Sequence, residues 1–201
     1  MPAYPRSRRA LAAIAAVALL PATALAQDAA PSATLAVGDQ APAFDAVDAY
    51  GKPWRSAGVV GKKILVVYFY PGAMTSGCTK QACAFRDDQS TLQELGAEVV
   101  GVSGDRGLTL IAFREQNRLN FPLLSDSSGA IAKAFGVPLS EGATITRVID
   151  GREVQLTRDV TAARWTYIID RQGRIAFKET EVDPAGDSKA VIVAIRKLTR
   201  G

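Results

Sequence analysis

The first candidate for chemistry is Cys78, which lies shortly after a strongly apolar stretch. Residues 63–70 are rich in β-branched and aromatic side chains and favour a buried central strand, which Pro71 ends. The apolar spacing of residues 75–95 predicts a helix with Cys78 in its first turn. Unpaired N–H groups and the positive end of the helix dipole favour a thiolate there. The position therefore suits a nucleophile that attacks an electrophilic oxygen or sulfur.

Each residue of this segment also has an interpretation without chemistry. Cys78 lies on the apolar face of the predicted helix, where an inert buried thiol fits equally well. Thr75 is placed to cap the helix by accepting a hydrogen bond from the Cys78 N–H, and Pro71 fits a strand terminator. Cys83 completes a pair that, in an exported protein, commonly forms a structural disulfide. Taken singly, the residues leave these alternatives open.

The sequence contains two cysteines and no histidine, and this composition excludes several classes of site. A zinc site uses about four cysteine or histidine ligands, and a Ser-His-Asp triad needs its imidazole. A c-type haem needs a histidine after its cysteine pair. Neither a P-loop nor a G-x-G-x-x-G motif is present, so we expect no cofactor.

The N-terminus has the pattern of a secretory signal peptide. Basic residues, a short apolar run and a small-residue cleavage site follow in order: Arg6, Arg8, Arg9, residues 10–20 and Ala24-Leu25-Ala26. We therefore expect residues 1–26 to be a signal peptide, residues 27–36 a flexible linker, and residues 37–201 one globular domain. The mature protein is expected to be periplasmic, without stable membrane insertion.

The charge of the chain gives no support for a nucleic-acid partner. Lysine and arginine exceed aspartate and glutamate by 24 − 20 = 4. Three of the arginines belong to the expected signal peptide, which has no acidic residue, so the remainder carries 21 − 20 = +1. We therefore expect the mature protein to bind no nucleic acid.

The order of predicted elements indicates an α/β domain with a mixed central sheet and flanking helices. The first half alternates strand and helix, which is typical of parallel pairing. The second half contains two antiparallel pairs, one of them around the Asp150-Gly151 turn signal, and then a C-terminal helix. The predicted strands are residues 63–70, 98–102, 144–148, 153–157, 164–169 and 175–178, and residues 123–126 are expected to form a short strand or a turn. The predicted helices are 75–95, 108–119, 130–135 and one with an apolar face at 191–198.

The segment around Cys78 closely resembles the active-site segment of peroxiredoxins. It is most similar to the subgroup called peroxiredoxin Q or bacterioferritin comigratory protein, whose pattern is P-x-x-x-T-x-x-C with a second cysteine five residues later. Pro71, Thr75, Cys78 and Cys83 match this pattern position by position. The resemblance extends over roughly residues 37–198 and includes Arg164, two residues before a threonine, where the family has its active-site arginine.

This resemblance implies a thioredoxin-like fold and the reduction of hydrogen peroxide and organic hydroperoxides, in antioxidant defence. Cys78 would be the peroxidatic cysteine and Cys83 the resolving cysteine that forms a disulfide with it. Arg164 would hold the thiolate and orient the peroxide, and Thr75 would hydrogen-bond the sulfur or the peroxide. Pro71 would shield the site from water.

The resemblance also implies partners for the enzyme. A thioredoxin-like dithiol protein would restore the reduced form, and in the periplasm it must itself be exported. We expect a monomer or a weak dimer, and a rim altered by residues 137–163, which are longer than in the simplest relatives. Two alternatives stay open: a thiol-disulfide oxidoreductase, although such enzymes use C-x-x-C, and a non-catalytic exported domain with a structural disulfide.

Two expectations about geometry follow from the residues alone. Cα atoms five residues apart in an ideal helix are roughly 8.7 Å apart, and a disulfide spans at most about 7 Å. If Cys78 and Cys83 share a helix, they can bond only after its first turns unwind. In addition, Arg164 begins an apolar strand, so we expect it to have a fixed anionic partner, either the thiolate or a carboxylate.

Overall fold

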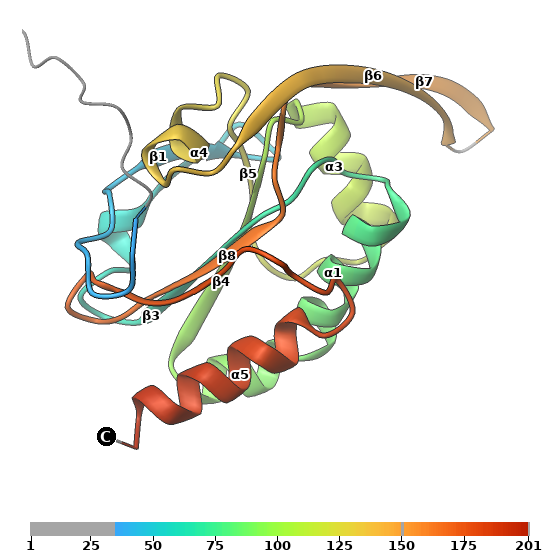
Figure 1. Cartoon of the computed structure of the whole chain (residues 1–201). Coiled ribbons are helices and arrows are strands. Elements are labelled where there is room, and N and C mark those ends of the chain that lie inside the picture. The colour runs from blue at the N-terminus through green and yellow to red at the C-terminus, as the bar shows by residue number, and fades with distance from the viewer. Residues whose placement is uncertain (1–34, 150, 201) are drawn as a thin grey trace, which may run out of the picture.

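A computed structural model describes residues 35–149 and 151–200 of the chain (Figure 1). The expected signal peptide and most of the expected linker lie outside these residues. The described residues form a seven-stranded sheet in the order β2-β1-β5-β4-β3-β8-β9. Its strands are β1 (Asp45–Asp48), β2 (Pro53–Arg55), β3 (Ile64–Phe69), β4 (Ala97–Ser103), β5 (Leu123–Ser125), β8 (Trp165–Ile169) and β9 (Ile175–Glu179).

The sheet is mixed, as the sequence predicts. Strand β3 pairs in parallel with β4, and β4 pairs in parallel with β5. On the other side of β3, strands β8 and β9 add antiparallel pairs, and β1 pairs antiparallel with both β5 and β2. The carboxyl ends of the three parallel strands therefore meet at one edge, where open α/β sheets commonly have their sites.

Helices cover both faces of the sheet. The helices are α1 (Ser76–Asp87), α2 (Gln89–Glu94), α3 (Gly107–Gln116), α4 (Ala130–Ala134) and α5 (Asp187–Leu198). One core cluster contains buried residues of α1, α2, α3 and α5, and a second cluster on the opposite face contains those of α4. No helix among the described residues has the length and apolarity needed to cross a membrane.

Strand β3 is buried on both faces, which explains its uninterrupted apolar sequence. Successive side chains of a strand point to opposite faces. Val66 and Tyr68 accordingly join the cluster under α1 and α5, whereas Leu65 and Phe69 join the cluster under α4. Burial on both sides fixes the register of β3 and thereby the position of the loop that follows it.

Two predicted elements differ from those observed. The single helix expected over residues 75–95 is interrupted at Asp88, where the backbone leaves the helical conformation (φ −93°, ψ 5°). The carboxylate of Asp88 accepts hydrogen bonds from Ser188 and Lys189 of α5. This tertiary contact, which no local pattern reveals, accompanies the break. The short strands β1 and β2 were not predicted, because four and three residues are too few to show an alternating pattern.

The second difference is the length of the hairpin around Gly151. Its strands β6 (Leu139–Ile149) and β7 (Arg152–Ala162) are about twice as long as expected, and they extend away from the sheet in Figure 1. The pairing continues to Leu139 and Ala162 because the base of the hairpin is held against the body of the domain. There the Asp159 N–H donates to the Gly104 carbonyl at 2.9 Å.

Candidate active site

A buried carboxylate, that of Asp105, fixes the loop between β3 and α1 through a hydrogen bond. Asp105, which follows β4, accepts hydrogen bonds from the Ala73 N–H at 2.7 Å and the Ser103 hydroxyl at 2.8 Å. Burial raises the pKa of Asp105, although these two hydrogen bonds and the nearby Arg158 oppose the shift. Met74 in the same loop has φ 64°, a left-handed conformation that non-glycine residues rarely adopt. Such strain commonly lies at functional sites, where surrounding contacts maintain it.

Cys78 lies in the first turn of α1, as the sequence predicts. Its side chain is buried, with 1% of its surface exposed. The guanidinium of Arg164 donates from Nη2 to the Cys78 Sγ at 3.4 Å. The sulfur therefore meets a fixed positive charge in addition to the N-terminus of the helix, and both stabilise a thiolate.

Arg164 precedes β8 and reaches across to α1. Besides the sulfur, it contacts Gln81, whose Oε1 accepts a hydrogen bond from the Arg164 Nη1 at 2.5 Å. Within residues 35–149 and 151–200, no carboxylate forms an ion pair with Arg164. Of the two expected anionic partners, a carboxylate or the thiolate, the guanidinium of Arg164 therefore contacts the Cys78 sulfur.

Gln81 belongs to a polar network that the sequence analysis missed. Its Nε2 donates to Asp187 Oδ2 at 2.6 Å, and the Thr166 hydroxyl donates to the same oxygen at 2.8 Å. Gln81 is fully buried, and it lies three residues after Cys78 on the helix. A glutamine on an otherwise apolar helix face was a usable signal for a partner, whereas Asp187 lies 106 residues further along the chain and had none.

Thr75 is at the N-cap position of α1, but its side chain does not cap the helix. Its hydroxyl instead donates to the Gly72 carbonyl at 2.9 Å. The expected hydrogen bond from the Cys78 N–H to this hydroxyl is wrong, since no side-chain hydrogen bond caps the helix at Thr75. Its oxygen lone pairs remain able to accept a proton from a bound substrate.

The base of the hairpin forms the rim next to this loop. Pro71 is half-buried and lines a cavity of about 300 Å³ together with Pro138, Leu139, Ser140, Thr161, Ala162 and Ala163. Arg158 of β7 lies directly over Gly72, where the methyl group of an alanine would approach its guanidinium to 2.5 Å. Residues of the hairpin thus surround Pro71, and the long segment contributes to the rim, as expected from its length.

Cys83 lies on the same helix, and both cysteines are free thiols in this structure. Its Sγ is half-buried and 3.8 Å from the Asn117 Oδ1. The neighbouring Arg86 donates to the Asn117 carbonyl at 2.6 Å. Because α1 includes both cysteines, a disulfide between them requires local unwinding of the helix.

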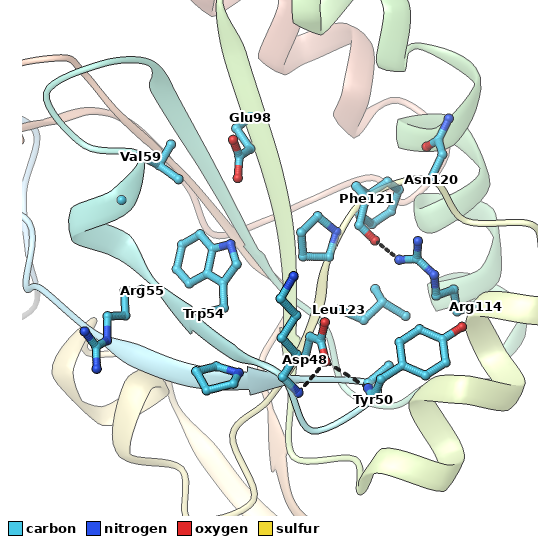
Figure 2. Close-up of a pocket in the computed structure, with 15 residues that line it drawn as sticks. Asp48, Tyr50, Trp54, Arg55, Val59, Glu98, Arg114, Asn120, Phe121 and Leu123 are labelled. Atoms are coloured by element: carbon cyan, nitrogen blue, oxygen red, sulfur yellow. Dashed lines mark hydrogen bonds between the residues drawn. The ribbon is translucent and has the colours of Figure 1, made fainter.

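A second, larger cavity lies near β1 and β2, at the end of the sheet that β2 forms (Figure 2). It has a volume of about 630 Å³, and Figure 2 shows Trp54, Tyr50 and Arg114 among its lining residues. Asp48 is engaged with backbone N–H groups of its own turn, and Arg114 donates to the Phe121 carbonyl. Neither cysteine lines this cavity, so the reactive chemistry belongs to the site at α1.

Comparison with known proteins gives consistent matches over most of the chain. Residues 37–178 match the AhpC/TSA family. A Mycobacterium tuberculosis protein named as a peroxiredoxin is 38% identical over 152 residues, which cover 76% of this chain and 89% of the relative. Peroxiredoxin Q of Sedum lineare chloroplasts is 40% identical over 136 residues, which cover 68% of this chain and 64% of the relative.

Two solved structures with a similar fold are also named as members of the peroxiredoxin family. Peroxidoxin BcpB of Mycobacterium tuberculosis has a TM-score of 0.68 at 30% identity, covering 82% of this chain and 98% of that one. The bacterioferritin comigratory protein of Xanthomonas campestris, described for its alkyl peroxide reduction activity, has a TM-score of 0.63 at 25% identity. That match covers 77% of this chain and 91% of the other.

Proposed function

We propose that Cys78 is the peroxidatic cysteine of this protein, because the chain belongs to the AhpC/TSA family and is a thiol-dependent peroxidase. The family and the thioredoxin-like fold expected from the sequence are both confirmed by the comparisons. The observation that carries the assignment to Cys78 is the 3.4 Å contact between its sulfur and the Arg164 guanidinium, at the N-terminus of α1. In the described residues the Cys83 sulfur has no hydrogen bond from a cation, and its partner is the Asn117 side chain.

In the first step, the Cys78 thiolate attacks one oxygen of a hydroperoxide. The S–O bond forms as the O–O bond breaks, the sulfur is oxidised to a sulfenic acid, and the other oxygen leaves as water or an alcohol after it gains a proton. Arg164 stabilises the thiolate and the negative charge that develops on the oxygens. The Thr75 oxygen accepts a hydrogen bond from the peroxide, and Pro71 keeps water from the sulfur.

In the second step, Cys83 acts as the resolving cysteine. Its thiolate attacks the sulfenic sulfur of Cys78, the disulfide forms, and the hydroxyl leaves as water. A thioredoxin-like dithiol protein then reduces the disulfide by two thiol exchanges and is itself oxidised. The first turns of α1 must open for the disulfide to form and close again afterwards.

We also propose that the enzyme works outside the cytoplasm. The basic, apolar and small-residue pattern of residues 1–26 supports removal of a signal peptide after Ala26. An exported enzyme needs an exported reductant, because cytosolic thioredoxin does not reach it. Mass spectrometry of protein from the native host tests the point, and an intact Met1 terminus would contradict it.

The test of the cysteine roles is peroxide consumption with dithiothreitol, followed by labelling of sulfenic acid. We expect Cys78→Ser to abolish turnover and labelling. Cys83→Ser is the matched control: once reduced and then freed of dithiothreitol, it should consume one equivalent of peroxide and accumulate sulfenic acid on Cys78. Turnover by Cys78→Ser at the wild-type rate, or a labelled Cys83 in the wild type, would contradict the assignment.

A further inference from the structure

Asp187 is a buried acid at the start of α5, and its contacts lead to the reactive sulfur. The residue is 3% exposed, and its Oδ2 accepts both hydrogen bonds described above, from Gln81 and Thr166. Its other oxygen, Oδ1, is buried without a hydrogen-bond partner among the described residues. A buried polar atom without a partner destabilises a fold, so stability alone gives little reason for an acid at this position.

The Gln81 amide is fully hydrogen-bonded in only one orientation. A guanidinium has donors and no acceptor, so the amide group that faces Arg164 must be the oxygen. The NH2 group then faces Asp187, which supplies an acceptor. Without that acceptor, the amide is free to rotate and to present its NH2 group to Arg164, and two donors would then face each other.

We propose that Asp187 is a positioning residue for peroxide reduction, which fixes the Gln81 amide so that Gln81 holds Arg164 against the Cys78 sulfur. This inference rests on the proposed role of Arg164. It connects the N-terminus of α5, which packs beside α1 in Figure 1, to the sulfur through three side chains.

The charged groups that act on Asp187 are Arg164 and Glu179 of β9, and the buried Tyr68 is a further titratable neighbour. Burial raises the pKa of Asp187, the hydrogen bonds from Gln81 and Thr166 and the charge of Arg164 lower it, and Glu179 raises it. On the neighbouring turn of α5, Lys189 is paired with Asp88. The Oδ2 oxygen can accept hydrogen bonds whether or not Oδ1 carries a proton, so the orientation of Gln81 does not depend on the charge of Asp187.

The first test is Asp187→Ala in a Cys83→Ser background, with the Cys78 thiolate followed by its ultraviolet absorbance across pH. We expect the midpoint of thiolate formation to rise by about one unit, and the second-order rate with hydrogen peroxide below that midpoint to fall about tenfold. Asp187→Leu gives the same test with a side chain of similar size and no acceptor, should the alanine variant not fold. Asp187→Asn keeps an acceptor for Gln81 and should match the parent.

Ser188→Ala is the matched control. Ser188 is also buried and donates to Asp88 from the same turn of α5, and among the described residues the side-chain hydrogen bonds of Gln81 go to Asp187 and Arg164 instead. It should leave the thiolate midpoint unchanged. A similar rise in this variant would show that the effect comes from the packing of α5, and would overturn the proposal.

The second test is rescue. Both oxygens of a glutamate accept hydrogen bonds, so Gln81→Glu needs no orienting partner, and Asp187→Ala with Gln81→Glu should return the rate to within about threefold of the parent. An Asp187→Ala variant that titrates like the parent, or a double variant that stays slow, would overturn the proposal. Arg164→Ala in the same assay distinguishes failure of the proposed role of Arg164 from failure of the proposed role of Asp187. If Arg164→Ala has no effect, the role of Arg164 itself is wrong.

Discussion

The two ends of α1 are held in different ways. At the N-terminal end, Cys78 and Gln81 contact polar partners, namely Arg164 and Asp187. Towards the C-terminal end, Phe85 is fully buried and stacks on Tyr68, with ring centroids 4.8 Å apart and planes 20° apart. Just beyond the helix, Asp88 accepts hydrogen bonds from the side chains of two α5 residues.

This difference fits what each end must do during turnover. Polar groups that leave one partner can be solvated by water, which offsets part of the free-energy cost of opening the first turns of α1. An aromatic ring that leaves the core has no such compensation. The helix can therefore open between the two cysteines while Phe85 and Asp88 keep the remainder in place.

The largest expected effect comes from breaking the apolar end. We expect Phe85→Ala to lower the free energy of unfolding by about 3–5 kcal/mol, because it removes a fully buried ring from the core. Urea unfolding measures the change. Leu108→Ala on α3, where the side chain is 75% exposed, is the control and should cost under about 1 kcal/mol. Equal losses would mean that Phe85 does not anchor the helix.

At the polar end, the expected loss is in activity and not in stability. Arg164→Ala should slow the reaction with hydrogen peroxide by about a hundredfold, since it removes the donor aimed at the sulfur. Arg164→Lys should be intermediate, because an ammonium cannot serve Cys78 and Gln81 with the same fork of donors. Stopped-flow kinetics gives the rates, with Arg55→Ala, a change at an exposed ion pair on β2, as the control. A wild-type rate for Arg164→Ala would remove this residue from the mechanism.

Hydrogen exchange tests the comparison directly. Peroxide treatment should speed amide exchange by at least about tenfold around residues 79–83, whereas amides near Leu92 should not change. The Cys83→Ser variant cannot form the intramolecular disulfide and serves as the control. Identical exchange in the reduced and oxidised enzyme, with the Cys78–Cys83 disulfide confirmed by mass, would show that no helix opens.

The sequence was sufficient to predict the strand before the site, the helix start and the placement of Cys78. These features depend on local patterns: an apolar β-branched run, a proline and a helical spacing. Arg164 was found through the family pattern, and its contact with the sulfur agrees with the expected anionic partner. Gln81 and Asp187 were missed because their partners come together only when α5 packs on α1, and the same packing accompanies the unpredicted break at Asp88.

The smallest expected effect concerns the ion pair between Asp88 and Lys189, just beyond the C-terminal end of α1. Burial raises the pKa of Asp88, but the hydrogen bonds from Lys189 and Ser188 outweigh it and leave the pKa below its ordinary value of 3.8. A lowered pKa in the folded state means that the contribution to stability is present above the unfolded value and is lost as the pH falls through the folded one. Asp88→Asn should therefore cost about 0.5 kcal/mol at pH 7, because Lys189 is 72% exposed, and the gap to wild type should narrow as the pH falls below 3.8. Lys189→Met, compared singly and with Asp88→Asn, isolates the pair in urea unfolding at pH 3 and pH 7. A gap that stays constant or widens on acidification would show that Asp88 holds α1 through its shape and not through its charge.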